Sequence, residues 1–489
     1  MDSHHQSCYR ALVARDARFD GLFFVGVTTT RIYCRPICPA RTPGSKNCRF
    51  FPVAAAAEQA GFRPCLRCRP ELAPGNSSVD AVGRVARMAA LRIQAGALND
   101  GGGVEELAGE FALCSRQLRR VMRQELGVSP VQLAQTHRLL LAKQLLTETR
   151  LPIVQVALAS GFESVRRFNS LFKSHYRLAP SRFRRSLQLP LEGEPLRLHL
   201  AFRPPLAWPE LLRFLADRAV AGVERVSASG YSRTVAIGSA RGWLSVAPGR
   251  IANTLCVELA PSLSGVLAPL LARLRHLFDL GARPAAIAGH LSGDPRIGKS
   301  VKRLPGLRVP GAFDGFDLAC RALLGQRISV RAATTLAGRL ADRFGETIET
   351  PDPALIRLAP DAERIATAAV DDLVGLGIAR TVAIAIGALA RAVSDGRLRI
   401  EPGAQVESTI DQLCELPGVG PWTAHYIAMR GLGWPDAFPD GDLGLLRGLG
   451  ESSAARVRTA AEAWRPWRAY AVMHVWNQLA VPISTRNKS

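Results

Sequence analysis

The stretch LCELPGVGPWTAHYIAM, residues 413–429, places Gly418 and Gly420 in a short turn between two segments with the apolar spacing of helices. Glycine allows the tight backbone of such a turn, and its missing side chain lets backbone N–H groups approach a DNA phosphate closely. The stretch therefore predicts a helix-hairpin-helix that binds DNA through Gly418 and Gly420. Because a Gly-x-Gly pair alone is a weak signal, the surrounding residues decide its meaning.

An aspartate follows this hairpin: FPDGDLGLL, residues 438–446, places Asp442 twenty residues beyond Trp422. A hairpin with a downstream aspartate resembles the helix-hairpin-helix DNA glycosylases. The segments DLACRALLGQRISV and WRPWRAYAVMHVW bring the resemblance closer to the AlkA alkylbase glycosylases. The resemblance covers about residues 196–483. It implies a small antiparallel sheet domain before the helices.

The same resemblance implies roles for individual residues. Asp442 matches the catalytic carboxylate; Asp440 competes for the role, but the family motif aligns with the second aspartate. Trp422, Tyr426 and Trp476 match aromatic positions of the base pocket, whereas spacing alone would favour a place in the helix core. Electron-rich rings bind a cationic methylated purine through cation–π contacts. The base must be flipped out of the duplex, and the carboxylate stabilises the oxocarbenium-like sugar.

Three positions refine this expectation. Trp422 stands where strand-cutting glycosylases of this fold carry a lysine, so the resemblance implies a monofunctional enzyme. Some relatives hold an iron–sulfur cluster with cysteines after the aspartate; no cysteine follows Cys414, so we expect no such cluster. Arg327 stands where the family wedges an apolar side chain into the DNA, and an arginine can fill and stack in that gap.

Two cysteine pairs lie nearer the N-terminus. Cys34 and Cys38 form a C-x3-C pair, and Cys65 and Cys68 form a C-x2-C pair. Two short-spaced pairs predict one tetrahedral zinc ion, because each pair supplies two thiolates. Spacing alone would favour a zinc knuckle that only holds a small domain together. Cys48 lies between the pairs at a spacing that fits neither, so we expect it to serve in packing.

The residues around these pairs add a second interpretation. The motifs RIYCRPICPAR (31–41) and GFRPCLRCRPE (61–71) resemble the N-terminal domain of the Ada adaptive-response protein over about residues 8–72. That resemblance implies that zinc holds the thiolates and that Cys34 accepts a methyl group from a DNA phosphotriester.

Polar and cationic residues surround the cysteines. Thr30 and Arg63 fall on positions that face DNA in the Ada family. Because a methyl phosphotriester lies within the phosphate backbone, cations beside Cys34 would favour binding of the substrate. We therefore expect the neighbouring arginines to draw DNA to Cys34: Arg31, Arg35 and Arg41.

A helical region follows, and it repeats one plan. VEELAGEFALCSRQLRRVMRQELGVSP (104–130) reads as a helix, a turn and a basic second helix with Ser115 as its N-cap. PIVQVALASGFESVRRFNSLFKSHYRLAPSRFRR (152–185) repeats the pattern with a turn at residues 160–162. Two such units joined by a long helix resemble the AraC-type transcription regulator domain.

The second helix of each unit carries the candidates for reading DNA. A base reader must reach the major groove, while most arginines on such helices contact only phosphate or solvent. For any single residue, the phosphate or solvent interpretation is favoured. The candidate readers are Arg116, Gln117, Arg120, Ser164, Arg166 and Arg167.

Length and charge agree with several DNA-binding domains. The 489 residues are too many for one core, and 63 Lys and Arg against 41 Asp and Glu give a net charge of +22. Such an excess indicates a polyanionic partner, most often nucleic acid, although a GC-rich genome would also raise the arginine content. The sequence shows neither a signal peptide nor a bilayer-long apolar run, so we expect a cytoplasmic protein without membrane contact.

We therefore predict a multidomain α+β fold. Linkers are expected at residues 73–78 and 189–195, and strands within LRLHLAF, RTVAIGS and LCVELAP, with helices near 208–219 and 262–278. The predicted domains are a small zinc domain (1–75), an all-α AraC-type double helix-turn-helix (79–187), a small antiparallel β-sheet domain with helices (195–293) and an all-α helix-hairpin-helix glycosylase domain (294–489).

The predicted function is an alkylation-damage response that joins a methyl acceptor, a transcription regulator and a base-excision glycosylase. Its expected partners are damaged DNA, promoter DNA and, for an activator, RNA polymerase. The Pro-Cys-His-Arg motif of Ada's second methyltransferase is missing, and the glycosylase takes its place. Two alternatives remain open: a DNA-binding regulator with an inactive glycosylase half, and a repair enzyme whose helix-turn-helix units only tether it to DNA.

Overall fold

The computed structural model describes residues 3–15, 19–20, 23–51, 54–68, 70, 81–99, 101–184 and 194–480. The predicted linker at 73–78 lies outside these residues, as do positions 189–193 of the second linker. The chain divides into two units. Unit 1 comprises Met1–Ala89 and Phe111–Ser129, and unit 2 comprises Ala90–Glu110 and Pro130–Ser489. Across the described ranges, no helix is long and apolar enough to cross a membrane.

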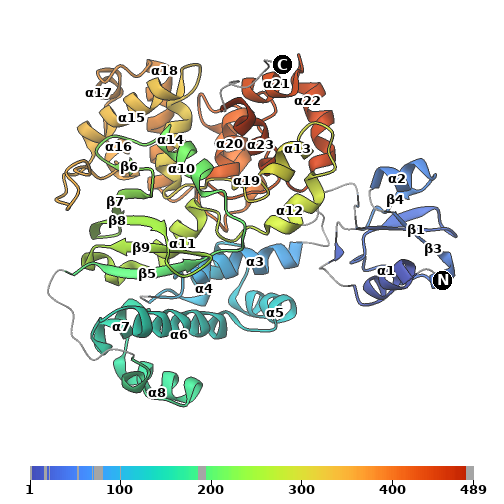
Figure 1. Cartoon of the computed structure of the whole chain (residues 1–489), viewed down its shortest axis with the longest axis horizontal. Helices are drawn as coiled ribbons and strands as arrows, with labels where there is room; N and C mark the ends of the chain where they lie inside the picture. Colours follow the sequence, from blue (N-terminus) through green and yellow to red (C-terminus); the bar gives the residue numbers. More distant parts are fainter. Residues whose placement is uncertain are drawn as a thin grey trace, which may run out of the picture. The chain divides into compact units, whose positions relative to one another are not determined.

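Unit 1 is built around a small sheet with the strand order β3–β1–β2–β4 (Figure 1). β1 runs antiparallel to β2 and β3, whereas β2 and β4 are parallel. Phe23 and Val25 belong to one small apolar core, and Tyr33 and Phe51 to another. The elements are α1 (Ser3–Val13), β1 (Phe24–Val27), β2 (Ile32–Cys34), η2 (Ser45–Asn47), β3 (Cys48–Phe51), α2 (Ala54–Gln59), β4 (Arg63–Pro64), α5 (Ser115–Leu126) and the first part of α3 (Ala81–Gln94).

The expected helix-turn-helix patterns are present. Gly161 takes a φ of +83° in the turn between α7 and α8, a conformation that suits glycine. One detail of the first pattern was wrong: Ser115 is the first residue of α5, and Cys114 is its N-cap. The helices of this region in unit 2 are α4 (Val104–Gly109), α6 (Pro130–Glu148), α7 (Ile153–Ala159), α8 (Val165–Tyr176) and α9 (Pro180–Phe183).

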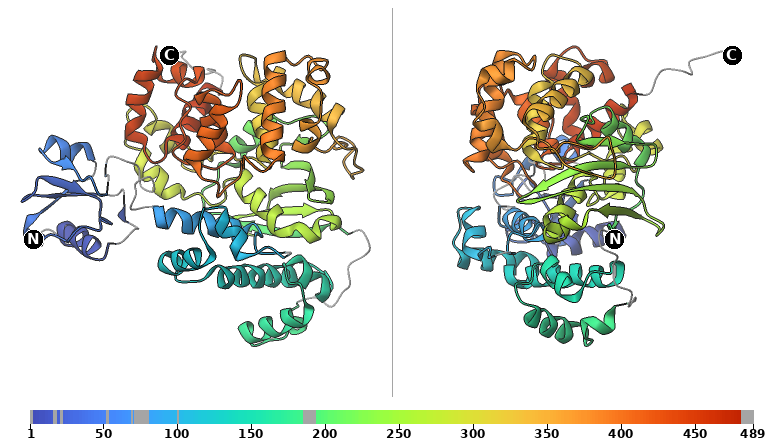
Figure 2. Two further views of the ribbon diagram at one scale, coloured as in Figure 1. Left: turned by 180° about the vertical axis from the view of Figure 1, so that it is seen from behind. Right: turned by 90° about the vertical axis from the view of Figure 1, so that its left-hand side faces the viewer.

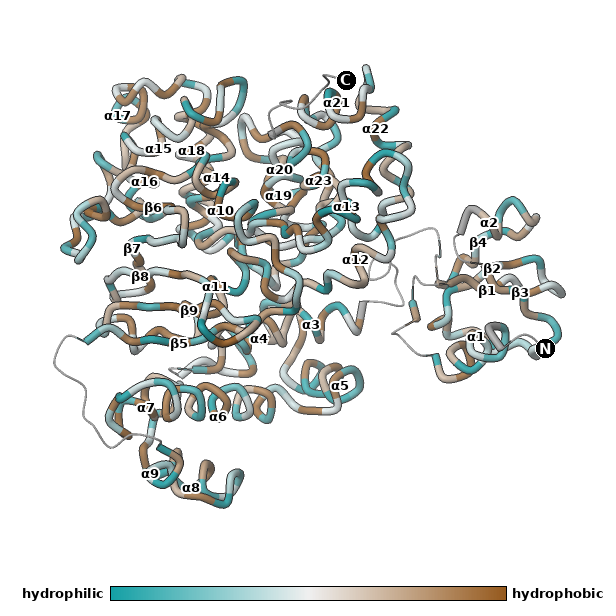
Figure 3. The backbone as a smooth tube through the Cα atoms, viewed as in Figure 1, coloured by the Kyte–Doolittle hydropathy of each residue, from teal (hydrophilic) through white to brown (hydrophobic). Residues whose placement is uncertain are grey.

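The sheet of unit 2 has the strand order β5–β9–β8–β7–β6, and every neighbouring pair is antiparallel. Buried and more exposed residues alternate along β5, and Figure 3 shows the matching alternation of hydropathy. Three strands were predicted, while β6 and β8 were not. The elements are β5 (Leu196–Ala201), α10 (Trp208–Ala216), β6 (Glu224–Val226), β7 (Tyr231–Ile237), β8 (Ala240–Pro248), β9 (Thr254–Leu259), η4 (Pro261–Val266) and α11 (Leu267–Leu277).

Part of the helix-turn-helix region shares a core with this sheet. Buried residues of α6, α7 and α8 belong to the same apolar cluster as the inward residues of β5 and β9. Polar contacts add to it: Gln144 Nε2 donates to the His199 carbonyl at 2.8 Å, and Glu148 accepts from the His199 N–H at 2.8 Å. In unit 2 the helices α6, α7 and α8 and the sheet therefore share buried apolar contacts.

The remaining helices of unit 2, drawn in yellow to red in Figure 2, share a separate apolar core. This core includes Ile287 and Leu291 of α12, which precede Asp294 in the chain. The elements are α12 (Pro284–Leu291), α13 (Gly298–Arg303), α14 (Gly315–Leu324), α15 (Val330–Phe344), α16 (Ala362–Ala366), α17 (Val370–Val374), α18 (Arg380–Ser394), α19 (Val406–Glu415), α20 (Pro421–Arg430), α21 (Leu443–Leu449), α22 (Ala454–Ala461), η5 (Glu462–Trp464) and α23 (Arg468–Ala480).

Candidate active sites and DNA-binding surfaces

Asp442 lies at the start of α21, where its side chain caps the helix. Oδ1 accepts the Leu445 N–H at 2.9 Å and the Trp476 indole N–H at 2.8 Å. Among the described residues, Oδ2 has no hydrogen-bond partner, so one carboxylate oxygen is held and the other is available to a substrate. Gly444 provides the space for this arrangement, because a Cβ there would lie 2.8 Å from Asp442 Oδ1.

Asp440, the competing carboxylate, has a different environment. It forms an ion pair with Arg458 at the surface. Its charge therefore already has a partner, whereas Asp442 contacts the Trp476 indole. Of the two carboxylates, Asp442 is therefore the one without an ion-pair partner among the described residues.

The three predicted pocket aromatics contact one another in series, and one of them, Trp476, contacts Asp442. Trp422 and Tyr426 are four residues apart on α20, and their rings stack with centroids 5.4 Å apart and an interplanar angle of 12°. The Trp476 ring of α23 lies 6.3 Å from that of Tyr426. All three are only partly buried, so they lie at the margin of the helical core and not inside it.

Residues that sequence reasoning missed complete the aromatic group. Phe214 of α10 has the Arg218 guanidinium 3.8 Å and the Arg430 guanidinium 4.9 Å from its ring centroid. Arg430 also donates to the Tyr426 hydroxyl at 2.8 Å. Burial alone would raise the pKa of Tyr426, but the charges of Arg430 and Arg218 outweigh it and lower that pKa. Phe214 and Arg218 come from a distant segment, and their local sequence carries no motif that would have found them.

The hairpin is formed as predicted, between α19 and α20. Gly418 has a φ of +76°, which requires glycine, whereas Gly420 is the N-cap of α20 with an ordinary φ of −91°. A Cβ built on Gly420 meets open space, so its backbone faces a free surface. Gln326 Nε2 donates to the Gly418 carbonyl at 2.9 Å and contacts Thr423 Oγ1 at 3.0 Å. The turn that carries Arg327 is therefore attached to the hairpin.

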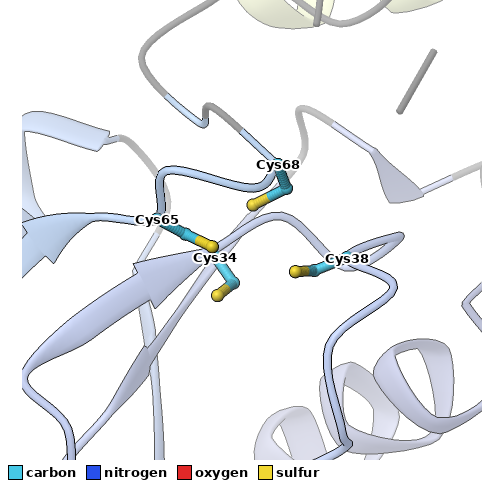
Figure 4. Close-up of side chains that lie close together, drawn as sticks. All are labelled: Cys34, Cys38, Cys65 and Cys68. Carbon is cyan, nitrogen blue, oxygen red and sulfur yellow. The ribbon is translucent and has the colours of Figure 1, made fainter. Parts of the chain in front are cut away.

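The four predicted zinc ligands meet in unit 1 (Figure 4). The Sγ atoms of Cys34, Cys38, Cys65 and Cys68 all lie within 4.8 Å of one another. Tetrahedral Zn–S bonds of about 2.3 Å separate the sulfurs by about 3.8 Å, so the cluster fits one zinc ion. Cys34 is half-buried and the other three are buried. Cys48 lies in a neighbouring apolar core, which confirms its role in packing.

The clustered thiols change one another's ionisation. Hydrogen bonds with Cys34 and Cys68 lower the pKa of Cys38, while the contact with Cys38 raises the pKa of Cys34. Thiols this close oppose full ionisation unless a cation compensates their charge. A bound zinc ion would supply that compensation and keep the thiolates deprotonated at neutral pH.

The arginines near the cluster have different roles. Arg35 is 1% exposed, its guanidinium is paired with Asp20, and its backbone N–H lies 3.4 Å from Cys68 Sγ. The expectation that Arg35 draws DNA to the site was therefore wrong, because a buried and paired cation cannot reach a phosphate. Thr30 and Arg63 are exposed. Arg31 and Arg41 are exposed as well, so the remaining candidates can all reach a ligand.

The candidate readers lie on the second helix of each helix-turn-helix. Arg116 and Arg120 of α5 are exposed, while Gln117 accepts the Cys114 N–H at 3.0 Å through its side-chain oxygen. Ser164 is the N-cap of α8 and accepts the Arg167 N–H at 3.4 Å, so Ser164 and Gln117 also stabilise helix starts. An open hollow of about 420 Å³ lies at the start of α8, and its lining includes Ser164, Arg166 and Arg167. The helix-turn-helix units, the helix-hairpin-helix and the four-cysteine cluster together are typical of a multidomain DNA-binding protein.

Comparison with known proteins narrows that class. Residues 7–71 match the metal binding domain of Ada, residues 107–186 a helix-turn-helix domain and residues 197–314 the AlkA N-terminal domain. The chain is 38% identical over 497 residues to a probable bifunctional transcriptional activator/DNA repair enzyme AlkA of Mycobacterium tuberculosis (strain H37Rv). The match covers 99% of this chain and 98% of the relative. The chain belongs to this family of fused Ada- and AlkA-type proteins.

Two further relatives match parts of the chain. DNA-3-methyladenine glycosylase 2 of Escherichia coli is 38% identical and covers 57% of this chain and 95% of its own length. The bifunctional transcriptional activator/DNA repair enzyme Ada of Escherichia coli is 34% identical over 25% of this chain and 33% of its own length. The Ada-type match and the four-thiolate geometry together define a site for one zinc ion.

Proposed function

We propose that this protein answers alkylation damage with base excision, methyl transfer and transcription control in one chain. The observation that carries the proposal is the Asp442 carboxylate, whose Oδ1 accepts two hydrogen bonds while Oδ2 accepts none from the described residues. Trp476, which donates one of these bonds, belongs to the aromatic group of Trp422, Tyr426 and Trp476. The name of the Escherichia coli glycosylase relative supports 3-methyladenine-type bases as the substrate class. We also propose domain limits of 1–75, 79–187, 195–293 and 294–489.

Base excision would proceed on a flipped nucleotide. The aromatic rings bind the cationic purine, whose glycosidic bond is already weak and needs no protonation of the leaving base. As that bond breaks, positive charge develops on the sugar, and Asp442 stabilises it and helps to orient or deprotonate water. The Trp476 indole fixes the carboxylate through Oδ1, which leaves Oδ2 for the sugar or the water.

The test of excision uses DNA methylated at defined purines. Asp442→Asn keeps the shape but removes the charge, so base release should fall at least about a hundredfold, as when one electrostatic stabiliser is removed. Asp440→Asn is the matched control, because Asp440 is paired with Arg458, and it should keep near-normal release. Equal loss in the two variants would contradict the assignment of Asp442.

We infer that the glycosylase is monofunctional. Strand cleavage by such enzymes needs an amine nucleophile, and the resemblance puts Trp422 of α20 (Pro421–Arg430) where those enzymes carry a lysine. The product should be an intact strand with an abasic site. Borohydride trapping of a covalent protein–DNA adduct would show that the inference is wrong.

We propose Cys34 as the methyl acceptor of the zinc site. Its sulfur would form a bond to the methyl carbon as the methyl–oxygen bond of the phosphotriester breaks, leaving a phosphodiester anion and a thioether. Cys34 is the most accessible of the four ligands. Thr30 and Arg63 are exposed and are proposed to contact the DNA. Mass spectrometry should find the methyl group on the Cys34 peptide, and methylation of another ligand in its place would overturn the assignment.

The third proposed activity is transcription control. Arg116 and Arg120 of α5, and Arg166 and Arg167 of α8, would contact promoter DNA, with RNA polymerase as the partner of an activator. We propose that the protein works in the cytoplasm. Footprinting of the promoters of its target genes tests the proposal, and protection independent of sequence would reduce the helix-turn-helix units to a tether.

A further inference from the structure

We infer that Arg327 reads the base opposite the damaged one, so that a methylated guanine is excised in preference where it is paired with cytosine and not with thymine. The inference rests on the proposed base excision. It concerns the turn between α14 and α15, where Arg327 has a φ of +61°. A left-handed backbone is costly for a residue other than glycine and persists only where its surroundings enforce it.

The surroundings of Arg327 are visible in the contacts of its neighbours. Gln326 attaches the turn to the hairpin through the Gly418 carbonyl and Thr423 Oγ1. On the other side Ser329 caps α15 by accepting the Ala332 N–H at 3.2 Å. The residue between these fixed points has little freedom, so the strained backbone is held and the side chain projects from it.

The Arg327 side chain has no polar partner among the described residues. It is exposed, and within the described residues its guanidinium makes neither a hydrogen bond nor an ion pair. Ile328 and Val330 beside it are 42% and 44% exposed. An unpaired cation flanked by exposed apolar side chains suits a surface that meets unstacked bases, because both apolar contact and hydrogen-bond donors are present.

Docking of the hairpin on a phosphate brings this turn to the duplex, since Gln326 joins the two. Base flipping leaves the opposite base without a partner and exposes its Watson–Crick edge. Cytosine presents two adjacent acceptors there, O2 and N3, which match two parallel N–H donors of an arginine. Thymine presents a donor between two acceptors, so an arginine can pair with only one of them at a time.

The experiment compares single-turnover base release by the full chain from two duplexes. They are identical except that one 7-methylguanine lies opposite cytosine or opposite thymine. A mispaired base flips more easily, so weak pairing alone would favour the thymine duplex. We expect the ratio of the cytosine rate to the thymine rate to be at least about fivefold higher for wild type than for Arg327→Leu, the low end of what a bidentate base contact provides.

Two further variants separate the effect of the paired guanidinium N–H donors from the effect of the positive charge. Arg327→Lys keeps the charge without the paired donors, so its rate ratio should resemble that of the leucine variant. Arg331→Leu removes another exposed cation four residues away and should slow both duplexes equally. An unchanged ratio in Arg327→Leu would overturn the inference while excision stands, whereas no release from either duplex would instead contradict the proposed excision.

Discussion

At the scale of single residues, the geometry around Asp442 depends on the absence of a side chain at Gly444. Gly444 leaves room for the carboxylate and the Trp476 indole, since a Cβ would lie 2.8 Å from Asp442 Oδ1 and 3.2 Å from the indole ring. Real Cβ atoms do not approach an oxygen so closely, so the carboxylate or the ring must move.

The prediction is that Gly444→Ala slows base release by about tenfold or more, because a small displacement of a catalytic group is costly. DNA binding should change little, since the hairpin and its turn are untouched. Gly441→Ala is the control, because a Cβ there meets open space. Single-turnover rates and gel-shift affinities measure the two effects, and a Gly444→Ala rate equal to wild type would show that the position of Asp442 is not critical.

Residues that belong to a local pattern were predictable, and residues that act through distant contacts were not. The four cysteines could be predicted because their spacing is itself the signal of a zinc site, whereas the catalytic role of Asp442 stays a prediction that rests on the family resemblance. The expectation that Arg35 contacts DNA was wrong, because the residues next to it in the sequence do not show that it would be buried and paired with Asp20. Phe214 was missed because its contact with Arg430 joins segments far apart in the chain.

At the scale of elements, the hairpin offers two glycines with different requirements. Gly418 needs its left-handed backbone, and a Cβ there would also lie 3.2 Å from that of Ala385. Gly420 has an ordinary backbone and open space around it. The first glycine is therefore required by the fold, and the second is proposed to be required by the DNA.

We predict that Gly418→Ala lowers the free energy of unfolding by about 1 kcal/mol or more, through backbone strain. Gly420→Ala should lower stability only modestly, because alanine is a poorer N-cap than glycine. It should weaken DNA binding, because a methyl group would come between the backbone N–H and a phosphate. All seven tryptophans of the chain lie between residues 208 and 476, so their fluorescence follows unfolding of this part. Equal stability and affinity in both variants would refute the distinction.

A second prediction at this scale concerns His474 of α23. Burial lowers the pKa of its imidazole to about 4, and its Nδ1 lies 3.1 Å from the Ser300 hydroxyl. The folded state therefore binds the proton less readily than the unfolded state. Stability from the neutral ring is complete above about pH 6.5, the unfolded value, and is lost as pH falls towards 4.

The variant His474→Asn should accordingly show a shallower loss of stability between about pH 6.5 and 4 than wild type. Comparison of the two proteins is needed because Asp279 acts in the opposite direction: burial raises the pKa of its carboxyl to about 6. Denaturant unfolding followed by tryptophan fluorescence supplies both slopes. Parallel pH profiles would mean that His474 does not contribute.

Some helices and strands could be predicted from the sequence and others could not. The hairpin, the second helix-turn-helix and three strands were predictable, because each shows its own periodicity or turn residue. The N-cap of α5 was not, since Cys114 takes the position that a serine would ordinarily fill. The contacts of α6 with β5 were not visible either, because the apolar residues of a helix do not show which surface they cover.

At the scale of the whole molecule, the account predicts that methylation of Cys34 strengthens promoter binding. Four thiolates on one zinc ion carry a net charge of about −2, and one methyl transfer leaves about −1. One unit of charge about 10 Å from a phosphate is worth about 0.4 kcal/mol in water and about 1.7 at an effective dielectric of 20. Several phosphates within reach would raise affinity at least about tenfold.

The measurement is promoter affinity with and without prior methyl transfer, at two salt concentrations. The gain should shrink as salt rises, because it is electrostatic. The Cys34→Ala variant lacks the acceptor, so exposure to methylated DNA should leave its affinity unchanged. Equal affinities of the two wild-type forms at low salt would remove the switch and leave Cys34 as a repair nucleophile only.

One chain is proposed to carry two independent repair sites, and a single incubation can measure both. The full chain is incubated with methylated DNA that contains both methylpurines and methyl phosphotriesters, and free bases and protein-bound methyl groups are counted together. Wild type should release bases repeatedly and acquire a single methyl group, on Cys34. Asp442→Asn should lose only the release, and Cys34→Ala only the protein methylation. Loss of both activities in either variant, or neither activity in wild type, would contradict the account.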